Sequence, residues 1–269
     1  MNSGSNDDYM FYCKTREGYV FKVLFELLKN CVKTSSIKFS KDGISITSID
    51  TKKQLLLLIN MNRHNFNIFR TASTFNISVN LTSFYNMLKT IKKKDGICLY
   101  IENSSPNKLH IIKDDMDQSE KCANKIQIMK TQDIEYENED DYKEPIIINA
   151  KKLQNTLKEI STTKGRITEI SSNGTSIRFF CDNGSIMTAD KTHGDIEIKQ
   201  DQIYKETFDS ALLAKLQKIL GLTQNVKVYI SEASPIKFNV NIGSLGEIII
   251  FIKSREIIAQ EEATDEPSE

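Results

Sequence analysis

The stretch GYVFKVLFELLKNCVK at positions 18–33 carries the clearest helical periodicity in the chain. Its apolar residues recur every three or four positions and fall on one helical face, made up of Val20, Val23, Leu24, Leu27, Leu28 and Cys31. Lys22 and Lys29 are seven residues apart, so they share another face. The pattern predicts an amphipathic helix with one apolar face and one basic face.

Three further segments have the same design. Their apolar residues at helical spacing are Phe84, Met87, Leu88 and Ile91 in 81–93, then Leu153, Leu157 and Ile160 in 151–163, and finally Leu212, Leu213, Leu216, Ile219 and Leu220 in 209–220. Gly221 ends the last pattern. We therefore predict four amphipathic helices.

Short apolar or alternating runs between these helices predict strands. They cover 36–39, 44–49, 55–61, 96–102 and 108–113 in the first half, and 166–171, 176–181, 185–189, 225–231, 235–242 and 247–253 in the second. Asp42-Gly43, Asn173-Gly174 and Asn183-Gly184 stand where hairpin turns are needed. The fold class is therefore α+β.

The spacing of the segments indicates an internal duplication. Gly18 and Lys151, which begin the first and third helices, are 133 residues apart, and Leu81 and Asp209 are 128 apart. We expect two similar domains at 10–128 and 146–257, joined by an acidic linker at 129–145. Residues 1–9 and the acidic residues 258–269 are expected to be disordered. Chance similarity between the halves is the alternative.

Each predicted helix carries lysines away from its apolar face. They are Lys22, Lys29, Lys89, Lys92, Lys93, Lys151, Lys158, Lys215 and Lys218. For a single helix this is the ordinary composition of a solvent-exposed face. Four such helices in a chain of zero net charge favour a surface for phosphate. Lysine point charges suit loose contact with a duplex backbone, and no aromatic platform for single strands is evident on these faces.

The acidic residues are concentrated elsewhere. Residues 133–144 hold seven acids against one lysine, and residues 261–269 hold five acids and no base. The rest of the chain is therefore basic on balance.

The sequence lacks the patterns of several other protein classes. Five widely spaced cysteines without a C-x-x-C pair argue against a disulfide framework or a metal site and favour a reducing, intracellular compartment. The longest apolar runs are of strand length, and there is no secretion signal. No phosphate-binding loop, nucleophile elbow or dinucleotide fingerprint occurs, so we expect neither catalysis nor a cofactor.

Three stretches resemble the proliferating cell nuclear antigen family of DNA sliding clamps. They are GISITSIDTKK at 43–53, SVNLTSFYNMLK at 78–89, and a third running from Val226 through SEASPI at 231–236 to Leu245-Gly246 and Phe251-Ile252. They occur in the family's order and spacing, and the succession of helices and strands fits from about residue 10 to 257.

The resemblance implies a ring of three subunits, each with two similar domains, helices inside and antiparallel sheets outside. In such a ring Lys22, Lys29, Lys89, Lys158 and Lys218 match basic positions facing the channel, whereas Asn86 and Asn155 depart from them. The matching subunit-interface strands contain Cys122, Lys125, Ile126 and Ile128 on one side, and Ser185, Ile186, Met187 and Ala189 on the other.

The resemblance also implies partners and a location. Double-stranded DNA, a DNA polymerase, a clamp loader and enzymes carrying a clamp-binding peptide would bind, the peptides in a pocket matching Ile49, Asp50, Ile134, Pro235, Phe251 and Ile252. The apolar members of this set could instead be ordinary ends of core strands. The location would be the nucleus, or a viral replication site for a viral gene.

Three other functions stay open at this point. The chain could be a checkpoint-type subunit of a heterotrimeric clamp, or a monomeric processivity factor of the same fold. Outside the clamp class, it could be an α+β interaction scaffold without a nucleic-acid role.

Overall fold

The computed structural model describes residues 8–114, 123–129, 142–162, 167–173, 176–181, 186–190 and 204–265. The chain forms two compact units. Unit 1 comprises Met1–Ile49, Leu57–Tyr136 and Ile242–Ile248, and unit 2 comprises Asp50–Leu56, Glu137–Asn241 and Ile249–Glu269. Each unit thus includes one short segment from the other half of the sequence.

Unit 1 contains a five-stranded antiparallel sheet with the order β5-β1-β7-β8-β9. Its strands are β1 (Tyr9–Thr15), β5 (Ile68–Thr71), β7 (Gly96–Glu102), β8 (Lys108–Asp114) and β9 (Ala123–Gln127). Because β9 pairs with β8 and ends this order, it is an edge strand. Its position matters for assembly, since an edge strand keeps one row of backbone groups without a partner in its own sheet.

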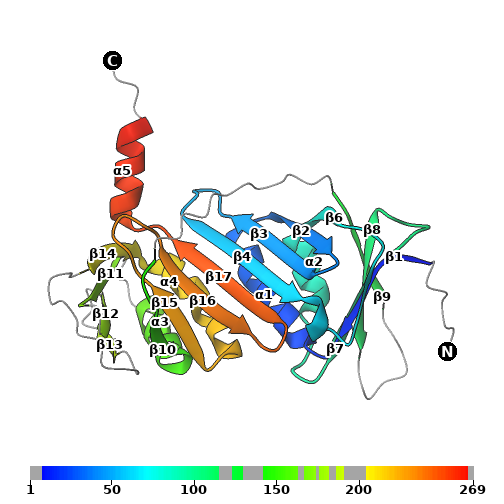
Figure 1. Cartoon of the computed structure of the whole chain (residues 1–269), viewed down its shortest axis with the longest axis horizontal. Helices are drawn as coiled ribbons and strands as arrows, with labels where there is room; N and C mark the ends of the chain where they lie inside the picture. The colour runs from blue at the N-terminus through cyan, green and yellow to red at the C-terminus, as the bar shows by residue number, and fades with distance from the viewer. Residues whose placement is uncertain are drawn as a thin grey trace. The chain divides into compact units, whose positions relative to one another are not determined.

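The rest of unit 1 consists of a run of strands and two helices that lie on one face of these strands (Figure 1). The strands are β2 (Thr34–Ser40), β3 (Gly43–Ile49), most of β4 (Leu55–Asn62) and β6 (Phe75–Asn80), and a short 3-10 helix η1 (Arg63–Asn65) follows β4. Helices α1 (Gly18–Cys31) and α2 (Leu81–Leu88) pack together, with the rings of Phe25 and Phe84 stacked at 3.9 Å between centroids. The predicted apolar face of α1 is buried as expected, apart from half-buried Cys31.

Unit 2 repeats this plan. One antiparallel sheet has the order β13-β12-β11-β14, with β11 (Ile167–Ser172), β12 (Ser176–Cys181), β13 (Ile186–Asp190) and β14 (Tyr204–Asp209). The other strands are β10 (Ile146–Asn149), β15 (Asn225–Tyr229), β16 (Ile236–Ile242) and β17 (Gly246–Ile252), of which the last two cross the boundary between the units. Helices α3 (Ala150–Thr162) and α4 (Ser210–Ala214) lie on one face of β15 and β16 (Figure 1). This repetition of layers confirms the predicted α+β class.

Two of the four predicted helices are shorter than their apolar periodicity indicated. Helix α2 ends at Leu88, although the pattern extended to residue 93, and Ile91 is buried in the turn that follows. Helix α4 ends at Ala214, and the chain continues as the 3-10 turns η2 (Lys215–Gln217) and η3 (Ile219–Leu222). A 3-10 turn can keep apolar residues on one side over a short distance, so periodicity alone did not separate it from an α-helix.

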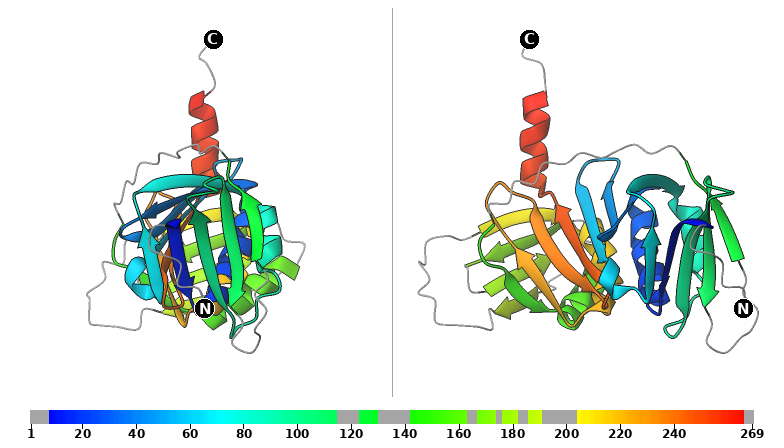
Figure 2. Two further views of the ribbon diagram at one scale, coloured as in Figure 1. Left: turned by 90° about the vertical axis from the view of Figure 1, so that its right-hand side faces the viewer. Right: turned by 45° about the vertical axis from the view of Figure 1, so that its right-hand side comes forward.

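The structure also has elements that the sequence analysis did not predict. Strands β1, β5, β6, β10 and β14 are short or interrupted by polar residues. Residues 258–269 were expected to be a disordered tail, but α5 (Arg255–Asp265) is a helix that extends from the sheets of unit 2 (Figures 1 and 2). The Ser254 hydroxyl accepts a hydrogen bond from the Ile257 N–H, which caps the first turn, and Ala259, Gln260, Glu261 and Glu262 favour helix.

Candidate nucleic-acid interface and partner surface

The predicted basic residues of unit 1 lie on the sides of α1 and α2 that are turned from the core. Lys22 and Lys29 are half-buried on α1, while Lys89, Lys92 and Lys93 are exposed at and after the end of α2. Asp95 orders the turn, because its carboxylate accepts a hydrogen bond from the Lys92 N–H at 2.7 Å and pairs with Lys113. The structure therefore brings the predicted lysines of this unit to two adjacent helices.

Lys22 is held more tightly than its sequence position indicated. Its ammonium group donates a 3.0 Å hydrogen bond to the carbonyl oxygen of Ile91, in the turn after α2. This contact spans 69 positions, and it exists because α2 ends early and leaves that carbonyl outside the helix. Lys22 thus links α1 to the end of α2 in addition to carrying charge.

Tyrosines stand among these lysines, although the sequence analysis found no evident aromatic platform for single strands on these faces. The ammonium of Lys29 lies 3.9 Å from the centroid of the Tyr85 ring. Lys22 and Lys93 lie 6.0 and 5.9 Å from the ring of Tyr19. Tyr19 precedes Lys22 by three residues, a helical-neighbour spacing that could have revealed it in the sequence. The pairing of Lys29 with Tyr85 depends on how α1 and α2 pack.

In unit 2, the predicted lysines Lys151 and Lys158 are exposed on α3, Lys218 is exposed after η2, and Lys215 is half-buried. Two glutamines fix the spacing of these elements. Gln154 donates to the carbonyl of Gln217 at 2.6 Å, and Gln217 donates to the carbonyl of Leu157 at 2.9 Å. Each unit therefore presents lysines on a pair of mutually fixed helical elements.

The predicted interface residues fall on edge strands as far as the structure describes them. Lys125 and Ile126 lie in β9, at one edge of the five-stranded sheet, and Ile128 follows it. Ile186, Met187 and Ala189 lie in β13, at one edge of the four-stranded sheet. Cys122 and Ser185 lie outside the described residues.

Four of the residues predicted to bind partner peptides lie in unit 2, where they differ in burial and hydrogen bonding. Asp50 is buried, and its carboxylate accepts hydrogen bonds from the N–H groups of Gln54 and Leu55 at 2.7 and 2.8 Å. Phe251 and Ile252 are buried in β17, and the carbonyl of Pro235 accepts a hydrogen bond from the Tyr142 hydroxyl. Ile49 is half-buried in unit 1, and Ile134 lies outside the described residues. The structure thus assigns Asp50 to turn formation.

Sequence reasoning missed a lysine among aromatic rings beside Phe251. The ammonium of Lys237 lies 5.0 Å from the ring centroids of Tyr142 and Tyr229, and 5.6 Å from that of Phe251. Tyr229 and Lys237 are opposite each other on β15 and β16. The surface around Phe251 is therefore aromatic and cationic.

Perturbed pKa values in unit 2 occur where α5 meets β14. Burial raises the pKa of Glu206, although hydrogen bonds from Ser254 and Tyr204 oppose the rise. Burial would also raise the pKa of Glu256, but hydrogen bonds from the side chain and backbone of Thr207 outweigh it and lower this pKa. The Glu256 shift therefore arises from a contact that holds α5 in place, whereas the Glu206 shift arises from burial.

The described part of the chain contains neither a candidate metal-ligand cluster nor a candidate membrane-spanning helix. No group of three or more His, Cys, Asp or Glu residues there could hold a metal ion. Of the helices it contains, none is long and apolar enough to cross a membrane.

Comparison with known proteins identifies two adjoining family matches. Residues 10–138 match the model for the proliferating cell nuclear antigen N-terminal domain, and residues 136–255 match that for the C-terminal domain. A probable DNA polymerase sliding clamp 1 of Paramecium bursaria Chlorella virus 1 is 21% identical, with 90% of this chain and 96% of the relative covered. The proliferating cell nuclear antigen of Saccharomyces cerevisiae is 22% identical, covering 87% of this chain and 94% of the relative, and that of Chaetomium thermophilum is 21% identical over 87% and 93%.

Proposed function

Because the chain belongs to the proliferating cell nuclear antigen family of DNA sliding clamps, we propose that three copies close around duplex DNA and hold replication and repair enzymes on it. The sliding-clamp function agrees with both matched domains and with the viral relative named as a DNA polymerase sliding clamp. In this function the chain is a scaffold, and the chemistry belongs to its partners.

The observation that supports DNA contact is the basic character of the helical elements in both units. Lys29 and Lys89 in unit 1, and Lys151, Lys158 and Lys218 in unit 2, lie on surfaces turned from the core. Ammonium groups attract phosphates and release counterions without reading base sequence. A clamp that slides along DNA needs phosphate contacts that do not depend on base sequence.

The observation that supports a closed ring is the presence of one suitable edge strand in each unit. Strands β9 and β13 each end a sheet order. A head-to-tail contact of β9 with β13 of the next copy would extend both sheets and satisfy both edges. Because such contacts are heterologous, they form a closed ring when the rotation between copies fits.

We place partner docking on the surface around Phe251 in unit 2. The Tyr142 ring lies beside Phe251, and Tyr142 is linked in turn to Pro235 by a hydrogen bond and to Tyr229 by an edge-on ring contact, so these residues offer contact area to a peptide. Lys237 adds a positive charge among the rings. This surface would favour a peptide whose apolar anchors are accompanied by an acidic residue.

Retention on DNA of different topology tests the proposal. After loading by a clamp loader, a ring should stay on closed circular DNA at high salt and should be lost once the DNA is cut. An electrostatic gripper, such as the monomeric factor, would dissociate from both forms as the salt rises. Equal loss from circular and linear DNA would refute encirclement, and a mass that reaches three subunits only with another protein would favour the heterotrimeric alternative.

A further inference from the structure

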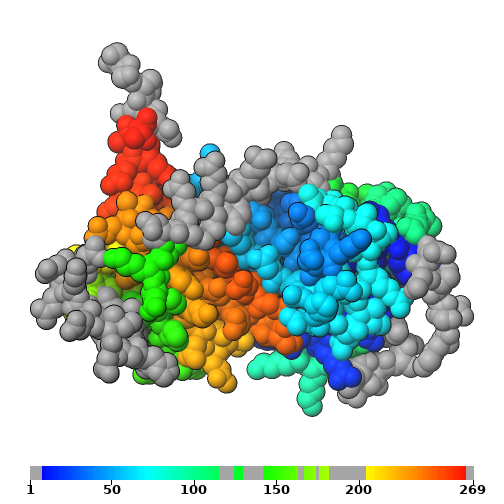
Figure 3. Space-filling view, in the orientation of Figure 1, coloured from blue at the N-terminus to red at the C-terminus, as the bar shows by residue number. Residues whose placement is uncertain are grey.

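Helix α5 adds a structural element beyond the matched family domains. The C-terminal family match ends at residue 255, and α5 runs from Arg255 to Asp265. Figure 3 shows the helix standing out from the rest of unit 2. Whatever α5 contributes to a site after residue 255 therefore lies beyond the matched domains.

The base of α5 is fixed in place by several contacts. The Glu256 carboxylate accepts hydrogen bonds from the Thr207 N–H at 3.0 and 3.2 Å and from the Thr207 hydroxyl at 2.7 Å. Ile257 is buried, and Lys253 forms an ion pair with Glu261. These contacts hold the first two turns against unit 2, so they can form a stable wall.

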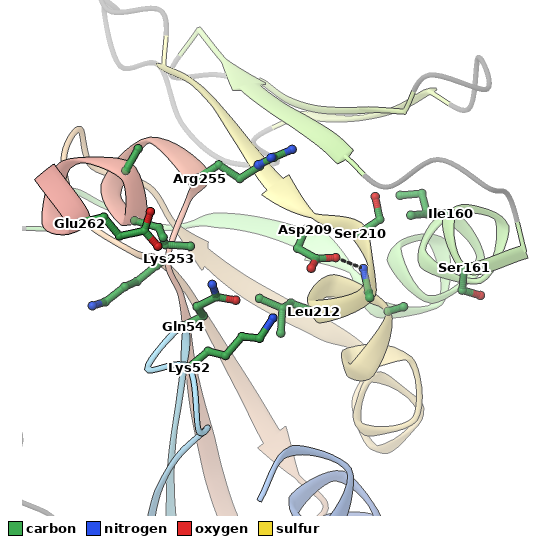
Figure 4. Close-up of a pocket in the computed structure, with 14 residues that line it drawn as sticks. Lys52, Gln54, Ile160, Ser161, Asp209, Ser210, Leu212, Lys253, Arg255 and Glu262 are labelled. Atoms are coloured by element: carbon green, nitrogen blue, oxygen red, sulfur yellow. Dashed lines mark hydrogen bonds between the residues drawn. The ribbon is translucent and has the colours of Figure 1, made fainter.

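This wall encloses one side of a pocket of about 840 Å³ (Figure 4). The opposite side comes from the end of α3, the start of α4 and the turn that Asp50 organises. Ile160, Leu212 and Ile258 provide apolar lining from three of these elements. The volume is within the range of pockets that hold small ligands or several side chains of a peptide.

Two unpaired cations stand at the pocket. Lys52 and Arg255 are exposed and take part in no ion pair within the described ranges, whereas Lys253 is paired with Glu261. In Figure 4 the Lys52 side chain runs toward Leu212. Of the two acids lining the pocket, Asp209 already caps α4 by accepting the Ala211 N–H at 2.8 Å, and Glu262 lies on α5. These two exposed positive groups are complementary in charge to an occupant that carries a carboxylate.

We propose that this pocket, named here the α5 pocket, binds a short partner segment that places an aliphatic side chain between Leu212 and Ile258 and a carboxylate beside Lys52 or Arg255. The pocket adjoins the end of β17, because Lys253 follows Ile252, lines the pocket and donates its N–H to the carbonyl of Gln54 in the Asp50 turn. The inference rests on the proposed function in that a clamp partner supplies the segment.

A peptide selection on the full-length protein tests this assignment. A random dodecapeptide phage library is selected on wild type after depletion on Ala259→Trp, whose indole fills the pocket from an exposed helix position. Enriched peptides are synthesised, and their affinities are measured by fluorescence anisotropy. Ala263→Trp is the matched control, because Ala263 is exposed on α5 and does not line the pocket.

We expect enriched peptides that combine an aliphatic residue with Asp or Glu, bind wild type and Ala263→Trp equally, and lose binding to Ala259→Trp. Replacing the peptide carboxylates by amides, or combining Lys52→Glu with Arg255→Glu, should weaken binding roughly tenfold or more, since charge-assisted contacts are lost. Thermal unfolding of each variant controls for folding.

Three results would overturn the proposal. Peptides could fail to distinguish wild type from Ala259→Trp, or the discriminating peptides could bind equally well without carboxylates. The third result is a change in subunit number for Ala259→Trp by light scattering, because the pocket would then be occupied by a second copy of the chain. Retention of Ala259→Trp on circular DNA is measured separately, so failure of the pocket and failure of the clamp function remain distinguishable.

Discussion

The tyrosines beside the lysines that we propose to face DNA limit where those lysines can place their charge. A free lysine side chain loses up to about 2 kcal/mol of rotamer entropy when it is fixed against a phosphate. The Tyr85 ring, 3.9 Å from the Lys29 ammonium, restricts that side chain before DNA binds. A cation–π contact of this exposed kind contributes about 0.5–1 kcal/mol. Tyr85 is therefore a positioning residue for Lys29.

Tyr85→Leu should weaken binding to a short duplex about two- to fivefold, since the cation–π contact is lost while every charge remains. The slope of log affinity against log salt should stay that of wild type, whereas Lys29→Gln should reduce it by about 0.9. Anisotropy titrations at several salt concentrations measure both quantities.

Tyr85→Phe keeps the aromatic ring and removes only the hydroxyl, so it tests the contributions of the two groups separately. A wild-type affinity for this variant is expected if the ring positions Lys29. An affinity as low as that of Tyr85→Leu would mean that the hydroxyl contacts phosphate, which contradicts the positioning role.

Among the contacts that hold α5, the Glu256 carboxylate is the one that accepts hydrogen bonds from Thr207 in β14. Because the pKa of Glu256 is lowered in the folded protein, its carboxylate contributes stability that is present above its unfolded pKa, near 4.5, and is lost as the pH falls through the lower folded value. Glu206 contributes in the opposite direction, because its pKa is raised and its ionisation costs stability as the pH rises. The contribution of Glu256 to the docking of α5 should thus be lost as the pH falls below about 4.5, whereas ionisation of Glu206 acts against stability as the pH rises.

Glu256→Gln should release α5 at neutral pH, because an amide is a weaker acceptor for the Thr207 N–H and hydroxyl. Amide hydrogen exchange at 255–265 should become faster, and its dependence on Glu256 ionisation at acid pH should disappear. Glu262→Gln, on the exposed part of the same helix, is the control and should exchange as wild type does. Unchanged protection in Glu256→Gln would show that Ile257 and the Lys253–Glu261 pair suffice to hold the helix.

Whether the sequence predicts a helix depends on where the contacts of that helix lie. Helix α1 was predicted well because its buried face is continuous along its length, and the positions of the lysines followed from that face. Helix α5 was missed because its acidic composition resembles a solvated tail, while its stability depends on Thr207, 49 positions earlier. The Lys22 bond to Ile91 and the pairing of Lys29 with Tyr85 were likewise not predictable, since they depend on where α2 ends and how it packs.

For the molecule as a whole, the proposed assembly would depend on backbone groups that no side-chain pattern records. The N–H of Ile128 donates to the carbonyl of Asn107, on the β8 side of the sheet. Because successive N–H groups of an antiparallel strand alternate in direction, that of Gln127 points away from β8. Within the described residues this outward donor has no partner, whereas the next N–H on that side, that of Met129, donates to the carbonyl of Ser78 at 2.8 Å.

Gln127→Pro should therefore dissociate the ring without unfolding the subunit. Proline removes the outward N–H and is tolerated on an edge strand when that side is not used within the chain. Wild type should have a mass near three times 30.7 kDa by light scattering, and Gln127→Pro should approach one subunit while keeping a similar melting temperature. Ile128→Pro is the contrasting variant, because it loses the bond to Asn107 and should lower the melting temperature. A trimer that persists in Gln127→Pro would exclude pairing through the β9 edge, and a monomeric wild type at micromolar concentration would exclude the homotrimer itself.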